Sequence, residues 1–174
     1  MTVSLRRLTA ILLLGLLTAC GFHLRGKGAN AGFAYPLVYI GGSGGTADQL
    51  RSYLPLLDNV KLATTPVENA TAKLVVNGEK VDNIVLTINS TGQATEYLVK
   101  LAVSFSAFRP DGTALMTDQS VQLQRSYSYD PNNPIAMNGE SDRLIKDMQQ
   151  DAVQLILRRV NAVAARDHAK PDAQ

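Results

Sequence analysis

The sequence predicts an α+β domain: a single, mostly antiparallel sheet with two helices packed on one face, in the element order β-α-β-β-β-α. Two patterns predict it. Between residues 72 and 129, apolar and polar residues alternate at the period of strands, and two turn signals interrupt the alternation. On either side, over residues 46–57 and 141–165, apolar residues recur at helical spacing. The three consecutive strands therefore form a meander whose apolar face is covered by the helices.

The first 20 residues indicate export. Arg6 and Arg7 precede an uncharged apolar run, residues 8–16, that is far shorter than the roughly 20 residues needed to span a bilayer. The stretch Leu17-Thr18-Ala19-Cys20 then resembles the lipobox of bacterial lipoproteins. The resemblance implies a thioether-linked diacylglycerol on Cys20, cleavage before it, and acylation of the new amino terminus. The alternative is an ordinary signal peptide cut near Ala19, which leaves Cys20 as a free thiol.

This interpretation divides the chain into a signal peptide (1–19), a lipidated amino terminus with a flexible linker (20–32), one α+β domain (33–168) and a tail (169–174). Loss of Arg6 and Arg7 lowers the number of basic residues from 17 to 15, which equals the number of acidic ones. A net charge near zero argues against nucleic acid as a partner, because such a partner requires a concentrated basic face. Cys20 is the only cysteine, so an intramolecular disulfide is impossible.

A strand is predicted over residues 33–40, before the run Gly41-Gly42-Ser43-Gly44-Gly45. Glycines let backbone N–H groups approach a phosphate, but the residues that would complete a phosphate-binding or dinucleotide-binding motif are absent. We interpret the run as a flexible turn into a helix. Thr46 and Gln49 form a capping-box pattern at its start, and Pro55 should kink or end it. The predicted buried stripe of this helix is Leu50, Tyr53, Leu54 and Leu57.

Each of the three long strands has one apolar face. A bulge or twist is expected near Gly78, where the first strand becomes polar. Turns are expected at Asn89-Ser90-Thr91-Gly92 and Arg109-Pro110-Asp111-Gly112, because proline presets φ and glycine accepts positive φ. The predicted core faces are Ala72, Leu74, Val76, Ile84, Leu86 and Ile88; then Tyr97, Val99, Leu101, Val103, Phe105 and Ala107; then Leu115, Val121, Leu123, Tyr127 and Tyr129.

The longest helix is predicted over residues 141–165, after a loop from Asp130 to Gly139. Arg159 falls inside its apolar stripe, where it either extends past its neighbours to solvent or pairs with a buried acceptor. The stripe consists of Leu144, Ile145, Met148, Ala152, Leu155, Ile156, Val160 and Val163.

No residues form a recognisable catalytic or metal-binding pattern. The two histidines, His23 and His168, have no plausible nucleophile near them in the sequence. Cys20 would be consumed by lipid, and Asp147 and Asp151 lie on the polar side of the last helix, which is typical of a solvated face. We therefore expect neither an enzyme nor a bound cofactor.

The other face of the predicted sheet is polar but carries few charges. It includes Ser104, Ser106, Gln122 and Gln124, whereas exposed sheets usually carry more lysine and glutamate. A surface that packs against another polar wall would avoid charge, because an unpaired buried charge is costly. The alternative is a plain solvated face.

Several segments are similar to the lipopolysaccharide-assembly lipoproteins of the LptE family. Cys20-Gly21-Phe22-His23-Leu24-Arg25-Gly26 resembles the start of the mature family members, and Asn89 to Tyr97 resembles their central turn and strand entry. Arg125-Ser126-Tyr127 followed by Asp130-Pro131 is similar to a further family segment, as is the last helix with Lys146-Asp147-Met148 and Arg158-Arg159. The resemblance covers nearly the whole mature chain.

The resemblance implies a lipoprotein anchored at the periplasmic face of the outer membrane, which plugs the LptD β-barrel one-to-one and engages lipopolysaccharide. The barrel-facing residues would be Ser104, Ser106, Gln122 and Gln124. Because the central turn has no basic residue, the candidate lipopolysaccharide contacts are Lys80, Lys100, Arg109 and Arg125. Two other roles remain open: an assembly or pilot lipoprotein for a different outer-membrane complex, and a periplasmic binder of small molecules.

Overall fold

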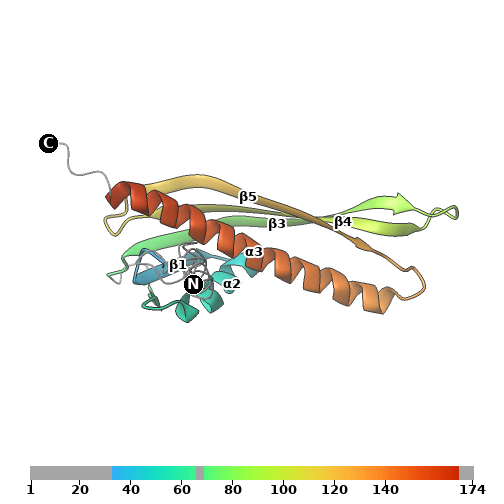
Figure 1. The fold of residues 1–174 in the computed structure, drawn as a ribbon, viewed down its shortest axis with the longest axis horizontal. Coiled ribbons are helices and arrows are strands. Elements are labelled where there is room, and N and C mark those ends of the chain that lie inside the picture. The colour runs from blue at the N-terminus through green and yellow to red at the C-terminus, as the bar shows by residue number, and fades with distance from the viewer. Residues whose placement is uncertain (1–32, 66–68, 169–174) are drawn as a thin grey trace, which may run out of the picture. The chain divides into compact units, whose positions relative to one another are not determined.

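A five-stranded sheet in the order β2-β1-β3-β4-β5 forms one layer, and the helices α2 and α3 pack on it as the other (Figure 1). The computed structural model describes residues 33–65 and 69–168. β1 is parallel to β2 and β3, whereas β3, β4 and β5 form an antiparallel meander. The predicted fold class is confirmed. The elements are β1 (Leu37–Gly42), α2 (Gly45–Tyr53), the 3₁₀ turn η1 (Leu54–Leu56), β2 (Lys61–Leu62), β3 (Ala72–Ile88), β4 (Ala94–Phe108), β5 (Ala114–Ser128) and α3 (Pro134–His168).

The amino-terminal part of the domain differs from the prediction in two places. The first strand covers Leu37–Gly42 rather than residues 33–40. Before it, the rings of Phe33 and Tyr35 meet edge to face at 5.7 Å, and the Ala34 N–H donates to the Asn161 side chain in α3. The strand β2 was not predicted, because two residues show no periodicity. These residues extend the sheet beyond the predicted meander.

The helix α2 follows the predicted pattern. Its last residue is Tyr53, and the chain continues from Leu54 as a 3₁₀ turn that contains Pro55. Leu50 and Leu54 are fully buried, while Tyr53 and Leu57 pack at the margin of the core. The predicted stripe and its end at the proline are both confirmed.

The turn between β1 and α2 depends on Gly42. This residue has a φ of 88°, and a Cβ built on it would lie 2.0 Å from the carbonyl oxygen of Val76. Any other residue would meet both an unfavourable backbone conformation and a clash with β3. At Gly42, where the glycine run leaves the sheet, its interpretation as a turn toward the helix is therefore confirmed.

The predicted capping box at the start of α2 is wrong. Gly44 is the N-cap, so Thr46 lies inside the first turn and is buried. Its backbone N–H donates to Glu79 Oε2 in β3 at 2.7 Å. The other carboxylate oxygen of Glu79 accepts from Gln149 Nε2 in α3 at 2.8 Å. A strand side chain therefore supplies the negative charge favoured at a helix start and also joins α2 to α3.

Three register shifts in β3 change which side chains face the helices. The one expected near Gly78 is present between Val76 and Gly78, and two more follow Val85, on either side of Thr87. An extra residue in one strand reverses its alternation from that point onward. The shift near Gly78 turns Ile84 away from the helices, and this residue is 41% exposed. Leu86 and Ile88 lie beyond the later shifts and are 48% and 60% exposed, so the predicted place of all three residues in the core was wrong.

The core lies between the helices and the first half of β3 together with most of β4. Phe105, Leu101 and Leu74 are among its largest fully buried side chains. At the other end of the sheet, Tyr97 stacks on Tyr127 at 5.7 Å, and all of the predicted apolar face of β4 points toward the helices. This part of the meander prediction is confirmed.

The helix α3 is longer than predicted and buries a wider stripe. It begins at Pro134, a residue favoured at the first helical position, so the preceding loop is shorter than expected. Leu155 is only partly buried, whereas Val153 and Leu157 are buried beside Ile156. Because α3 contacts α2 as well as β4 and β5, it needs apolar residues on two adjoining sides.

Candidate functional site

The outer face is our name for the side of β3, β4 and β5 that points away from α2 and α3. Side chains alternate along a strand, and Val99, Leu101 and Val103 of β4 are buried under the helices, so Lys100, Ala102 and Ser104 point the other way. No element within residues 33–65 and 69–168 covers this side of the meander (Figure 1). Two neighbouring rows of cross-strand partners lie on it: Lys80, Ala102 and Gln122, then Asp82, Lys100 and Gln124.

Three of the four residues predicted to face a barrel offer surface on the outer face. Gln122 and Gln124 are exposed, and both lie on β5. Ser104 is half-buried, and its hydroxyl donates to Gly78 O at 3.3 Å. Together they form a polar strip without charge along β4 and β5.

Ser106 is different, because it is only 5% exposed. Its hydroxyl oxygen accepts from Asn77 Nδ2 at 2.8 Å and from the Asp118 N–H at 3.3 Å. Asn77 and Asp118 belong to the irregular parts of β3 and β5, and Asp118 has a φ of 50°. The hydroxyl of Ser106 thus holds two bulges beside β4, and the residue has almost no surface left for a partner.

The two candidate lysines lie in the neighbouring rows of the outer face. Lys80 Nζ is 2.8 Å from Asp82 Oδ2, and Lys100 is the cross-strand partner of Asp82. The side chains of Lys80 and Asp82 are 73% and 44% exposed, and ion pairs so open to water contribute little. Both lysines are therefore accessible to an anionic ligand.

Arg125 and Arg159 join β5 to α3 instead. The Arg125 guanidinium forms an ion pair with Asp151, one of the two carboxylates predicted to lie on a solvated helix face. Arg159 Nη1 donates to Ser120 O at 2.6 Å. Arg159 is exposed, so it extends past the apolar stripe to the strand rather than pairing with a buried acceptor.

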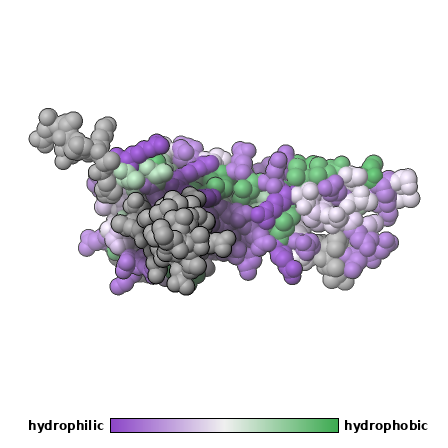
Figure 2. Space-filling view, in the orientation of Figure 1, coloured by the Kyte–Doolittle hydropathy of each residue, from purple (hydrophilic) through white to green (hydrophobic). Residues whose placement is uncertain are grey.

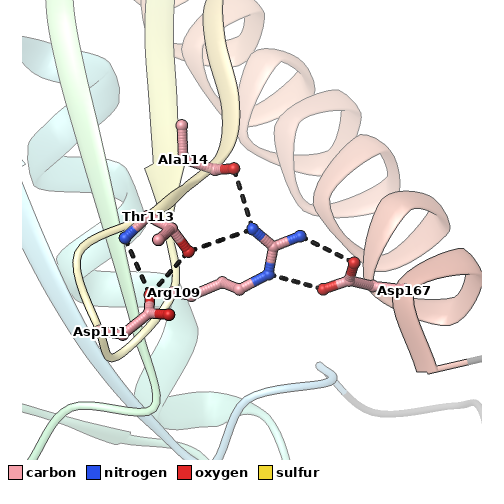
Figure 3. Close-up of polar contacts among 5 residues, drawn as sticks. All are labelled: Arg109, Asp111, Thr113, Ala114 and Asp167. Carbon is pink, nitrogen blue, oxygen red and sulfur yellow. Dashed lines mark hydrogen bonds and ion pairs between the residues drawn. The ribbon is translucent and has the colours of Figure 1, made fainter. Parts of the chain in front are cut away.

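Arg109 fastens the β4–β5 turn to the end of α3 (Figure 3). Its Nε and Nη2 each donate to the Asp167 carboxylate at 2.7 Å, and its Nη1 donates to Ala114 O at 3.0 Å. The hydrogen bond to Asp167 is the main cause that raises the pKa of Arg109. Because all three nitrogens have partners within the fold, Arg109 is poorly placed to bind a further anion.

The same turn is fixed by Asp111. Its Oδ1 accepts from the Thr113 hydroxyl at 2.6 Å and from the Thr113 N–H at 2.8 Å (Figure 3). These bonds, the hydroxyl first, lower the pKa of Asp111. Gly112 has a φ of 83° and donates to Arg109 O at 3.0 Å, which confirms the predicted turn.

The β3–β4 turn is held in a similar way. Asn89 Oδ1 accepts from the N–H groups of Thr91 and Gln93 at 3.0 and 2.9 Å, and Gly92 has a φ of 80°. The turn is therefore defined by its own hydrogen bonds. It presents polar, uncharged side chains at the end of the longest hairpin.

The predicted lipidation site and one of the two histidines lie outside the described residues. Cys20 and His23 belong to the part of the chain before residue 33, whereas His168 is the last residue of α3. Within residues 33–65 and 69–168, the side chains form no cluster of three or more metal-binding groups. No helix in these same ranges is long and apolar enough to cross a membrane.

The chain is similar to solved structures of bacterial lipoproteins. The solution structure of uncharacterized lipoprotein B from Nitrosomonas europaea superposes with a TM-score of 0.67 at 26% identity, over 83% of this chain and 93% of that one. Rare lipoprotein B from Shewanella oneidensis gives 0.65 at 22% identity, over 76% and 98% of the two chains. A minor lipoprotein from Acinetobacter baumannii gives 0.58 at 23% identity, over 75% and 93%. The last two support the fold alone.

Comparison by sequence adds the family. Among proteins of curated function, none matches this chain significantly. Residues 42–160, which run from the end of β1 to the last third of α3, match the family described as LptE, lipopolysaccharide-assembly. Since this match covers most of the α+β domain, the chain belongs to the LptE family of lipopolysaccharide-assembly lipoproteins.

Proposed function

We propose that this protein is a lipid-anchored lipoprotein of the outer membrane, facing the periplasm, that occupies the lumen of an LptD-like β-barrel and assists the insertion of lipopolysaccharide at the cell surface. Its role is structural and not enzymatic, and one copy serves one barrel. The observation that carries the proposal is the outer face, whose β5 row bears exposed glutamine and serine without charge beside Ala102 and Ser104 of β4. Its charged side chains Lys80, Asp82 and Lys100 lie on β3 and β4.

A barrel lumen is lined with polar side chains, so a plug must present a surface that pairs with polar groups. Neutral amides such as those of Gln122 and Gln124 can exchange water for protein partners at little cost. Charged side chains in the same places would have to be desolvated. The uncharged β5 side of the outer face fits the first situation.

Lipopolysaccharide contact is proposed for Lys80 and Lys100, because the phosphate groups of this lipid are anionic and both lysines lie on the outer face. Arg109 and Arg125, which were candidates by sequence, are engaged with Asp167 and Asp151. We therefore assign them to holding α3 on the meander. The anchor is proposed to be the acylated Cys20, since two or three acyl chains bind a membrane almost irreversibly.

The test is depletion of the protein in cells, with affinity capture of the tagged wild-type protein from detergent in parallel. The expected result is loss of newly exposed surface lipopolysaccharide, loss of mature barrel, and capture of one large β-barrel protein per lipoprotein. Normal surface lipopolysaccharide and barrel after full depletion would contradict the proposal. Replacing Cys20 with serine should also abolish lipid labelling of the chain.

One observation favours the small-molecule alternative. A groove of about 410 Å³ lies between α2 with η1 on one side and α3 on the other. Tyr53, Leu56, Val153 and Gln154 are among its lining residues, and Leu56 is 77% exposed. Native mass spectrometry of the captured protein would decide: a bound molecule of low mass with no barrel supports this alternative.

A further inference from the structure

The strand β3 has an open edge along its second half. β1 pairs with β3 only from Val38 opposite Ala72 to Gly42 opposite Val76. Beyond Val76, no strand among residues 33–65 and 69–168 pairs with β3 on that side. Between the register shift at Gly78 and the shifts that follow Val85, residues 78–85 remain in regular register with β4. This stretch is as long as a full strand, so it can accept a neighbour.

The direction of the main-chain groups on this edge follows from the pairing. The Tyr129 N–H donates to Thr95 O, so Thr95 directs its backbone toward β5. Successive residues of a strand direct their backbone groups to opposite sides, so the odd-numbered residues of β4 face β5 and the even-numbered ones face β3. Lys80 and Asp82, the partners of Ala102 and Lys100, are therefore bonded to β4.

The intervening residues of β3 then direct their N–H and C=O groups to the open edge. They are Glu79, Val81, Asn83 and Val85. A row of groups left unpaired within residues 33–65 and 69–168 is a template for another strand, and proteins usually protect it with proline, charged side chains or a covering element. Residues 78–85 contain no proline. Of their charged residues, Glu79 is bonded to α2 and α3, and Lys80 pairs with Asp82.

Three of the eight residues along the same stretch are exposed apolar ones, beside the charged residues Glu79, Lys80 and Asp82. Val81, Ile84 and Val85 are 37%, 41% and 47% exposed. Figure 2 shows apolar side chains gathered toward the β3–β4 end of the domain. Apolar side chains on both faces of an open strand are typical of a strand that becomes covered on both sides.

We propose that this edge, residues 78–85 of β3, receives an extended segment of the partner protein, which adds a strand to the sheet beside β3. The inference rests on the proposed function and names the mode of contact with that partner. Only a peptide backbone can satisfy the alternating N–H and C=O groups of Glu79, Val81, Asn83 and Val85; a lipid chain offers no such groups.

A second copy of this chain is a weaker occupant. Eight residues span about 27 Å, and a sheet edge is about 10 Å thick, so edge-to-edge pairing covers roughly 270 Å² on each copy. A stable interface buries about 800 Å² per partner. The occupant must therefore hold the domain by other surfaces as well, as a partner that also contacts the outer face would do.

The test uses two variants of the full-length lipoprotein, Asn83→Pro and Asn83→Ala, each captured from membranes in detergent. Proline removes the outward N–H of Asn83 and leaves the ladder to β4 intact, since proline is tolerated on strands whose N–H faces outward. Alanine removes the same side chain but keeps the N–H, so it is the matched control. We expect Asn83→Pro to recover about tenfold less barrel than Asn83→Ala, as loss of roughly one hydrogen bond with its neighbouring contacts predicts.

A photo-crosslinking residue, p-benzoylphenylalanine, in place of Asn83 provides an independent readout in living cells. The expected product has the mass of the lipoprotein plus a large outer-membrane protein. Equal capture by the proline and alanine variants, or no cross-link at this position, overturns the edge proposal. A cross-linked product of twice the chain mass overturns it in favour of a second copy. If the proline variant melts at a lower temperature than the alanine variant, the cross-link alone decides.

These outcomes are separable from those of the proposed function. If wild-type protein captures no barrel, the proposed function fails and the edge proposal with it. If wild-type protein captures the barrel and both Asn83 variants do so equally, only the edge proposal fails.

Discussion

Individual polar residues connect the two layers of this domain. The sequence shows which residues are charged but not which partners they meet in the other layer. Arg109, Arg125 and Arg159 all extend from their own element to the other layer, where they meet Asp167, Asp151 and a β5 carbonyl. The charge of Arg109 and Arg125 suggested anion binding in the sequence, because side-chain partners far apart in the chain cannot be identified from spacing. The structure therefore leaves the two lysines of the outer face as the accessible cations among the four candidates.

Glu79 is a residue whose role could not be predicted. In the sequence it is one charge within a polar strand, yet in the fold it caps α2 through the Thr46 N–H and also binds Gln149. We predict that Glu79→Ala lowers the free energy of unfolding by about 1–2 kcal/mol, the usual effect of removing a helix cap. Denaturant unfolding of the purified lipoprotein measures this difference.

The control for this prediction is Lys80→Ala, one residue further along β3 on the outer face. A change to an exposed side chain without buried contacts should stay within about 0.5 kcal/mol. Equal stability of the Glu79 and Lys80 variants would show that the cap contributes nothing. In Glu79→Gln, one amide group replaces a carboxylate oxygen, so we expect an intermediate loss.

Tyr35 predicts a pH dependence at the alkaline end. It is 8% exposed, and burial first, with nearby Asp167 second, raises its pKa above the ordinary value of 10.0. A group whose pKa is raised in the folded state adds stability that is present below its unfolded pKa and lost as the pH rises through the folded one. The melting temperature should therefore fall above about pH 10, and Tyr35→Phe should reduce that fall.

The measurement compares melting curves of the wild-type and Tyr35→Phe proteins between neutral and alkaline pH. At pH 7 the two proteins should differ little, since the hydroxyl is neutral in both states there. Parallel declines of the two curves above pH 10 would contradict a contribution from Tyr35.

At the scale of elements, the sequence predicted the long strands and the helices, but it did not predict correctly every face that they bury. The alternation in β4 is unbroken over its central part, so its core face was correct. In β3 a bulge was expected near Gly78, yet the core face was continued across it without the reversal that an extra residue causes. Whether such an irregularity adds a residue, and so reverses the faces, depends on the neighbouring strand, here through the bond between Asn77 and Ser106. That information is absent from the local sequence.

In the helix α3, too, the sequence predicted the element but not all of the residues that it buries. Ile156 is fully buried, whereas its neighbour Leu155 is only partly buried at the margin of the core. Ile156→Ala should lower the free energy of unfolding by about 2–5 kcal/mol, because a cavity remains in a close-packed interior. Leu155→Ala should lower it clearly less, by about 1–2 kcal/mol. Chemical denaturation of the two variants side by side tests whether the buried side of α3 is centred on Ile156 rather than on Leu155. A larger loss of stability in Leu155→Ala than in Ile156→Ala would contradict this.

At the scale of the whole domain, the structure has one closed side and two open surfaces. The helices cover one face of the meander, while the outer face and the edge of β3 beyond Val76 are left uncovered by residues 33–65 and 69–168. The composition of the outer face was predicted from the alternation, because β4 and β5 keep their register there. The open edge was not predicted, since it depends on where β1 ends beside β3. Both surfaces can be tested without disturbing the core.

The last prediction separates a solvated outer face from one that packs against a barrel. Gln122→Glu and Gln124→Glu together change shape little and add two carboxylates to exposed positions of β5. Gln124 lies opposite Lys100, so in the free protein the new charges should change the free energy of unfolding by no more than about 0.5 kcal/mol each. Against a barrel wall the carboxylate of Gln122→Glu, which lies opposite Ala102 and has no cation across the strand, should cost several kcal/mol before water enters the interface.

We therefore expect a nearly normal melting temperature of the purified lipoprotein together with strongly reduced capture of the barrel. Gln150→Glu with Gln154→Glu is the matched control, because it adds the same charges to exposed positions of α3, on the other side of the domain. Loss of capture in the β5 pair alone places the barrel against the outer face. Equal loss in both pairs would mean that added negative charge anywhere weakens the complex, as long-range repulsion does, and raising the salt concentration should then restore both. Normal capture by the β5 pair would show that the outer face stays in water and that the plug presents another surface to the barrel.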